Sequence, residues 1–157
     1  MMISFIRKVN NLIEPLRKIA DLVGSPVFDL SIRLYMAYVF FKSGLSRFQS
    51  YLKGSCDPEV FLFDFEHPVP GLDPSTAATI TTAAELILPV FLAVGLFARF
   101  GAAGMLAMTA VITFTYSGSV WFESLLWFTM LGSVFVKGPG MISADYWLVK
   151  WLRKNPA

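Results

Sequence analysis

Four long apolar stretches alternate with polar connections along the chain, and each is long enough for a helix that crosses a bilayer. They cover about residues 26–48, 74–97, 100–116 and 120–136. A transmembrane helix needs roughly 17–25 apolar residues, so the last two stretches lie near the lower limit. The only long connection is residues 49–73. The pattern predicts an all-α membrane protein, with a bundle of four transmembrane helices within residues 26–137.

Local signals mark the ends of these stretches. Ser25 and Pro26, and later Asp73 and Pro74, each have the pattern of an N-cap residue followed by a proline at the first helical position. The run that starts at Lys137 and continues as Gly-Pro-Gly predicts the end of the fourth helix. Inside the third stretch, two glycines predict close helix contacts, because small residues let backbones approach. They are Gly101 and Gly104.

The two ends of the chain have an interfacial pattern. Residues 1–25 carry apolar side chains at helical spacing with bases between them, as in a helix that lies among lipid headgroups. Pro15 predicts a kink there or two short helices. Residues 138–157 predict a tail that restarts as a helix near Ser143, with tryptophans as anchors and bases that face phosphates.

Composition and charge agree with a membrane location. Hydrophobic residues make up 55% of the chain and charged residues 15%, against roughly 25% charged in a soluble domain. Nine of the thirteen Lys and Arg residues fall on the side of the N-terminus. The protein is expected in the inner (plasma) membrane of the cell. By the positive-inside rule, both of its termini are expected in the cytoplasm. A net charge of +2 is too small to predict a nucleic-acid partner.

Four ionisable residues fall inside the predicted spans: Arg33, Lys42, Glu85 and Glu123. Each costs about 2.5–3.5 kcal/mol at mid-bilayer, so each is expected to face the bundle and find a partner. Depth along the helices predicts two ion pairs, Arg33 with Glu85 and Lys42 with Glu123. Such pairs fit two roles, either holding helices in register or forming a ligand site.

Glu85 differs from the other three because of the residue that follows it by one helical turn. Pro89 has no N–H to donate to the Glu85 carbonyl, which predicts a kink at this depth. In lipid such a carbonyl is tolerated only where protein or water supplies another donor.

Cys56 and His67 are single residues of their kinds. They predict no dithiol and no metal site, only an inert thiol and a surface histidine.

A series of short motifs is spread along the chain in a particular order. The motifs are Arg33, Phe40-Phe41-Lys42-Ser43-Gly44-Leu45-Ser46-Arg47, Leu62-Phe63-Asp64-Phe65-Glu66-His67-Pro68-Val69-Pro70, Ala83-Ala84-Glu85-Leu86-Ile87-Leu88-Pro89, Gly95, Leu125-Leu126-Trp127, Lys137-Gly138-Pro139-Gly140, Ser143 and Asp145. No motif is specific alone, but in this order they resemble the DoxX family of small four-helix membrane proteins. At Ser124 many relatives carry a histidine instead, which weakens a catalytic interpretation.

The resemblance implies a component of a membrane redox system, in some relatives linked to quinone. A quinone would then be held by Arg33, Lys42, Glu85 or Glu123, with Glu85 as the catalytic proton acceptor. Electrons would come from a soluble oxidoreductase partner, since a lone cysteine cannot run dithiol chemistry. The alternative is a scaffold that anchors such an enzyme at the membrane. A transporter ranks below both, because no inverted repeat is visible. A homo-oligomer is one option for assembly.

Overall fold

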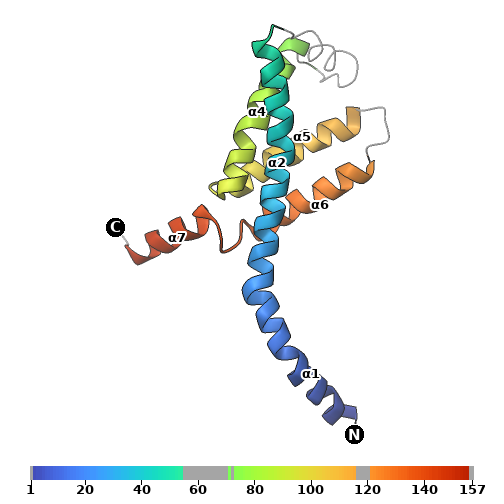
Figure 1. The fold of residues 1–157 in the computed structure, drawn as a ribbon, viewed down its shortest axis with the longest axis vertical. Coiled ribbons are helices and arrows are strands. Elements are labelled where there is room, and N and C mark those ends of the chain that lie inside the picture. Colours follow the sequence, from blue (N-terminus) through green and yellow to red (C-terminus); the bar gives the residue numbers. More distant parts are fainter. Residues whose placement is uncertain (1, 55–70, 72, 116–120, 156–157) are drawn as a thin grey trace.

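The computed structural model describes residues 2–54, 71, 73–115 and 121–155, and every regular element in that part is helical. In chain order the elements are α1 (Met2–Ile19), the π-helical η1 (Ala20–Gly24), α2 (Ser25–Leu52), α4 (Pro74–Val94), α5 (Ala98–Thr115), α6 (Trp121–Lys137) and α7 (Ala144–Lys154) (Figure 1). The predicted all-α class is therefore confirmed over these residues. Cys56, His67 and most of the long connection lie outside the described residues.

The first three elements form one continuous helical rod, so the predicted break before the first span is wrong (Figure 1). Ser25 is not an N-cap: its φ of −60° and ψ of −50° are helical, and its N–H donates to the carbonyl of Ala20, five residues back. This π-type bond lies directly before Pro26, which has no N–H to donate. The π-helical turn accommodates the missing bond, so the helix continues. Pro15 likewise lies within α1.

Four of the helices close a ring of contacts. α2 packs on α4, α4 on α5, α5 on α6, and α6 returns to α2. In Figure 1 the α5–α6 hairpin lies obliquely to α2 and α4, α7 extends to one side, and α1 runs away from the body. The core, where these four helices meet, consists of Ile32, Met36, Phe40, Leu92, Ala98, Ala102, Met105, Leu131 and Val134.

Glycines set the spacing between α4 and α5. A Cβ on Gly101 would lie 3.1 Å from the carbonyl oxygen of Leu88, and a Cβ on Gly104 only 2.6 Å from a methyl carbon of the same residue. A side chain at Gly101 would press on the backbone of α4, and one at Gly104 would force Leu88 to move, so the two glycines favour the close approach of α4 and α5. The predicted close contacts in the third span are confirmed.

The ends of α4 and α6 lie at prolines and glycines, whose backbone conformations start or stop a helix. α4 begins at Pro74 behind Asp73, as predicted. The Ser75 hydroxyl donates to the Asp73 carboxylate at 2.5 Å, and this bond lowers the pKa of that exposed carboxyl. α4 ends at Val94, earlier than predicted, because Gly95 adopts the left-handed conformation with φ 73° that glycine favours. α6 ends at Lys137, as predicted.

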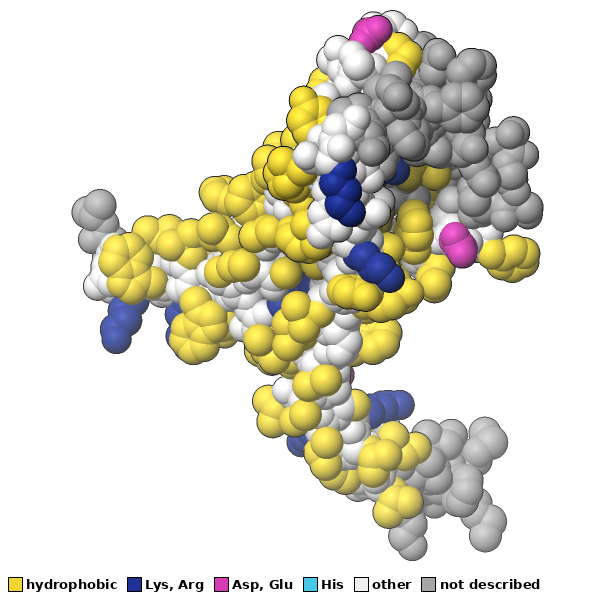
Figure 2. All heavy atoms as spheres, turned by 45° about the horizontal axis from the view of Figure 1, so that its top comes forward, with side chains coloured by type: hydrophobic (Ala, Val, Ile, Leu, Met, Phe, Trp, Pro, Cys, Tyr) yellow, Lys and Arg dark blue, Asp and Glu magenta, His cyan; other side chains and the backbone are white. Residues whose placement is uncertain are grey.

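Apolar side chains cover much of the outer surface (Figure 2). Phe114 is 82% exposed and Phe122 is 89% exposed. Apolar surface of this extent is unusual for a soluble monomer and suits contact with lipid. Of the described helices, α4 alone combines the length and the apolar composition needed for a bilayer crossing; residues Ala98–Phe114 of α5 are apolar but form a shorter stretch.

Candidate functional site between α2 and α4

One face of α2 carries the residues that build the interior. Arg33, Phe40, Gly44 and Arg47 follow one another at intervals of seven, four and three residues, which keeps them on one side of a helix. Of these, the first three are buried. Lys42 lies nine residues after Arg33, roughly 180° around the helix at about 100° per residue. Its side chain is accordingly exposed, with Nζ 5.9 Å from the centre of the Tyr38 ring.

The buried carboxylate of Glu85 forms an ion pair with Arg47. Arg47 Nη1 lies 3.3 Å from Glu85 Oε1, and Glu85 is only 2% exposed. Gly44 makes this contact reachable, because a Cβ on it would lie 2.8 Å from Glu85 Cβ. The two helices therefore touch at Gly44, and the arginine one turn further along α2 extends to the carboxylate. The predicted pairing of Glu85 with Arg33 is wrong.

Pro89 is buried within α4, which remains helical on both sides of it. The Glu85 carbonyl oxygen, to which Pro89 cannot donate, lies 3.2 Å from the point that a Cβ on Gly44 would occupy. The contact with α2 thus covers the backbone of α4 at the turn that the proline alters. The kink itself stays a prediction.

Arg33 occupies a separate, inner cluster, which we define as Arg33, Gly95, Ile142 and Asp145. Arg33 is 1% exposed; its Nη1 donates to the Leu92 carbonyl at 3.4 Å, and its Nη2 donates to the Ile142 carbonyl. Leu92 lies in the last turn of α4, whose carbonyls have no helical partner and which favours a cation. Gly95 is required beside it, because a Cβ there would collide with Arg33 Nη1 and with Ser143.

Asp145 completes the inner cluster from α7. Its two carboxylate oxygens accept the N–H groups of Phe97, at 2.9 Å, and Ala98, at 3.1 Å. Its own N–H donates to the Gly95 carbonyl at 2.9 Å. The carboxylate caps the positive end of α5 and fastens the start of α7 to the turn between α4 and α5. Residues distant in the sequence therefore meet at one end of the helix bundle.

Replacing Asp145 with alanine is expected to lower the free energy of unfolding by about 1–2 kcal/mol, the usual cost of a lost N-cap. For a chain of this size that corresponds to roughly 2–8 °C in thermal unfolding of the purified protein. Asp21→Ala is the matched control, because Asp21 is an exposed acid on η1. Equal melting temperatures for the two variants would show that the cap contributes nothing.

Lys42 and Glu123 do not form the predicted ion pair. Both side chains are exposed, and among the described residues no ion pair joins them. Their similar depth was the basis of the prediction, but contact also requires that each side chain face the other helix. Lys42 faces away from the bundle, and Glu123 lies in the first turn of α6.

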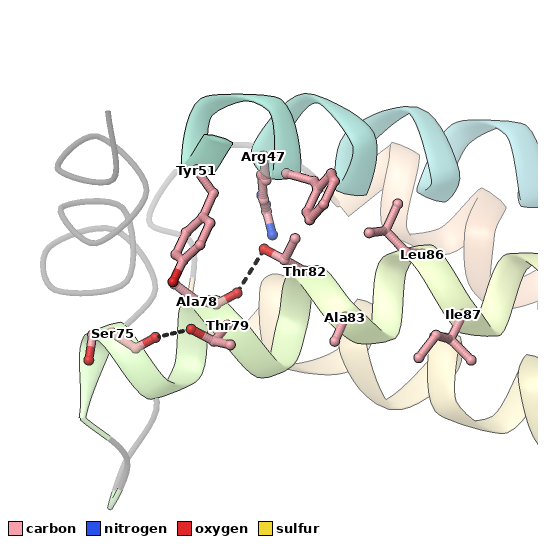
Figure 3. A pocket seen from close by; sticks show the side chains of 10 residues that line it. Arg47, Tyr51, Ser75, Ala78, Thr79, Thr82, Ala83, Leu86 and Ile87 are labelled. Carbon is pink, nitrogen blue, oxygen red and sulfur yellow. Dashed lines mark hydrogen bonds between the residues drawn. The ribbon is translucent and has the colours of Figure 1, made fainter. Parts of the chain in front are cut away.

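A cavity of about 580 Å³ lies beside the Glu85–Arg47 pair, between α2 and α4 (Figure 3). Its lining residues are Arg47, Phe48, Tyr51, Ser75, Ala78, Thr79, Thr82, Ala83, Leu86 and Ile87. Thr79 and Thr82 donate their hydroxyl hydrogens to the backbone carbonyls of Ser75 and Ala78, at 2.9 and 2.8 Å. Within the cavity, those two hydroxyl oxygens can therefore only accept. Arg47 and Tyr51 are the donors on the opposite wall.

The candidate site therefore differs from the predicted one in its residues. Of the four predicted ligand-binding residues, Glu85 alone lies next to the cavity, and it reaches the lining through Arg47. Arg33, Lys42 and Glu123 are elsewhere. Arg47, which lines the cavity, was not among the residues predicted from the sequence to bind a ligand. The spacing from Arg33 through Gly44 was the signal that could have placed it on the inward face.

A helical chain with an apolar exterior and buried charges has the character of an integral membrane protein. A family model described as DoxX matches residues 28–118, more than half of the chain. The chain belongs to the DoxX family, and with it to the membrane proteins. The match includes Arg33, Arg47 and Glu85, whereas α6 and α7 follow it. No curated protein and no solved structure matches the chain.

Proposed function

We propose that this protein is a membrane-integral subunit of a redox system that binds a quinone between α2 and α4. The observation that carries the proposal is a cavity with a buried ion pair at its polar side and hydrocarbon along α4. Arg47 supplies hydrogen-bond donors, and Ala83, Leu86 and Ile87 supply an apolar wall. About 580 Å³ is within the usual range for a small-molecule site.

The chemistry of a quinone matches these walls. Its two carbonyl oxygens accept hydrogen bonds, and its ring and isoprenoid tail are apolar. Arg47 and Tyr51 would donate to the carbonyls, and the Arg47 guanidinium carries a positive charge. That fixed charge would stabilise electron density that gathers on a quinone oxygen during reduction. Glu85, which does not line the cavity, would act as a positioning residue that holds Arg47.

Electrons would come from a partner oxidoreductase, since the single cysteine of the chain cannot run dithiol chemistry alone. We propose four crossings by α2, α4, α5 and α6, with both termini in the cytoplasm and the protein in the inner membrane. The ring of contacts among these helices supports the crossings. The excess of bases on the α7 side supports the orientation.

Binding of a short-chain ubiquinone analogue to the purified protein tests the proposal. Arg47→Gln alone would leave Glu85 buried without its cation, so the decisive variant is the double change Arg47→Gln with Glu85→Gln, which removes both charges. Loss of the charged donor is expected to weaken binding about 10- to 100-fold. The matched control is Lys42→Gln, which removes one positive charge from the outward face of α2 and is expected to bind normally.

Two outcomes would reject the quinone site. The wild-type protein could fail to bind the analogue, or the double variant could bind it with wild-type affinity while remaining folded. Helical circular dichroism and the melting temperature of each variant establish folding independently of binding. Normal binding by Arg47→Gln with Glu85→Gln would place any quinone outside the cavity.

The second candidate is a scaffold that recruits a soluble oxidoreductase, and α1 is the observation that favours it. This helix extends away from the ring of four helices (Figure 1), and Leu12, Leu16 and Leu22 on the rod are each more than 70% exposed. A scaffold predicts that Leu12→Asp with Leu16→Asp abolishes co-purification of the partner. The double variant at Arg47 and Glu85 would then retain the partner, which distinguishes the two functions.

A further inference from the structure

A second hollow lies at the opposite end of the bundle from the cavity between α2 and α4. It is bounded by α7, the first turns of α5 and the end of α6. Its volume is about 1050 Å³. Four bases line it, contributed by three helices: Arg99, Lys137, Lys150 and Arg153. We call this hollow the basic groove. It contains one acid, Asp145, whose two oxygens already accept the N–H groups that begin α5.

Among the residues that the structure describes, none forms an ion pair with the four bases of the basic groove. Arg99 Nη2 reaches only the Val136 carbonyl, at 3.5 Å, and Lys150 Nζ lies 5.0 Å from the centre of the Trp147 ring. Like charges gathered without counter-charges favour an anionic ligand.

Exposed aromatic residues line the same groove. Phe100 is 71% exposed, Phe97 is 64% exposed, and Phe135 joins them from α6. A small soluble anion would gain nothing from these rings, whereas a ligand with hydrocarbon chains would cover them. In Figure 2 the arm formed by α7 likewise has basic side chains along its lower edge and hydrophobic ones over the rest. Charge and apolar surface are thus paired throughout this region.

We propose that the basic groove binds an anionic phospholipid of the leaflet in which α7 lies. The headgroup phosphate sits among Arg99, Lys137 and the bases of α7, and the acyl chains lie along Phe100 and Phe135. Basic pockets at the cytoplasmic ends of membrane helices provide this recognition. The inference is independent of the quinone proposal, because the two sites share no lining residue.

Native mass spectrometry of the full-length protein with equal amounts of phosphatidylglycerol and phosphatidylcholine tests the inference. The wild-type protein is expected to retain phosphatidylglycerol preferentially. Lys137→Gln with Arg153→Gln removes two bases and is expected to weaken retention about 10- to 30-fold, from roughly a three- to fivefold effect per base. The matched control is Lys42→Gln with Lys53→Gln, which removes two exposed bases outside the groove and is expected to retain the lipid normally.

A variant that changes no charged residue tests the aromatic lining of the basic groove. Phe100→Ser is expected to reduce phosphatidylglycerol retention severalfold while leaving every base in place. Equal retention of the two lipids by the wild type would overturn the proposal, as would wild-type retention by the folded double variant at Lys137 and Arg153. Displacement of the lipid by inorganic phosphate would identify a site for soluble anions instead and equally overturn the proposal.

Discussion

Replacing Arg33 with methionine is expected to lower the free energy of unfolding by about 2–6 kcal/mol. Methionine fills a similar volume, so the loss comes from hydrogen bonds rather than from a void. The carbonyls of Leu92 and Ile142 would both lose a charged donor. The bond to Leu92 is buried and the bond to Ile142 is partly buried, and an acceptor left without its donor in such a place costs about 1–3 kcal/mol. Thermal unfolding in detergent, followed by helical circular dichroism, measures the effect.

The control for this prediction is Lys42→Met. It removes the same charge from the same helix, but from an exposed side chain, so its effect is expected to stay within about 0.5 kcal/mol. If Arg33→Met and Lys42→Met unfold at the same temperature, the hydrogen bonds of the inner cluster do not stabilise the fold. An Arg33→Met protein that folds with a lowered melting temperature and binds the quinone analogue normally would confine Arg33 to a structural role.

Gly44→Ala is expected to destabilise the protein by about 1–3 kcal/mol, the range for overpacking a close contact. The added Cβ would lie 2.8 Å from Glu85 Cβ and 3.0 Å from its carbonyl carbon, so α2 and α4 must separate. The separation also stretches the 3.3 Å ion pair between Arg47 and Glu85. We therefore expect weaker binding of the quinone analogue together with a lower melting temperature.

Gly132→Ala provides a control of opposite sign. Nothing lies within 4 Å of a Cβ at Gly132, which is also inside a helix. Alanine there removes the helix penalty of glycine and is expected to stabilise α6 by up to about 1 kcal/mol. Similar destabilisation by Gly44→Ala and Gly132→Ala would contradict the close approach of α2 and α4.

The parts of the fold that the sequence predicted correctly depend on neighbouring residues alone. Proline after Asp73 starts a helix, and glycines after Lys137 end one, because backbone conformation decides both. The same reasoning failed at Ser25 and Pro26, where the local signal of a helix start is identical. There the chain continues as a helix through a π-helical turn. Local chemistry allows either outcome, and the rest of the helix determines which one forms.

The candidate site was harder to predict because charges were matched by depth alone. Two side chains meet only if they share both a level in the membrane and a facing direction. Lys42 fails the second condition because its side chain is exposed, whereas Arg47 reaches Glu85 along the α2–α4 contact at Gly44. The prediction that Arg33 pairs with a carboxylate is wrong for a different reason. Its partners are backbone carbonyls, which every residue has and which no sequence pattern reveals.

The bond from Arg33 to the Ile142 carbonyl also has a consequence for synthesis. The two residues are 109 positions apart, and ribosomes build a chain from its N-terminus at about 5–20 residues per second. Arg33 is therefore synthesised roughly 5–20 seconds before its second acceptor exists. A nascent chain stalled between the two residues would expose a charged side chain that the finished protein buries.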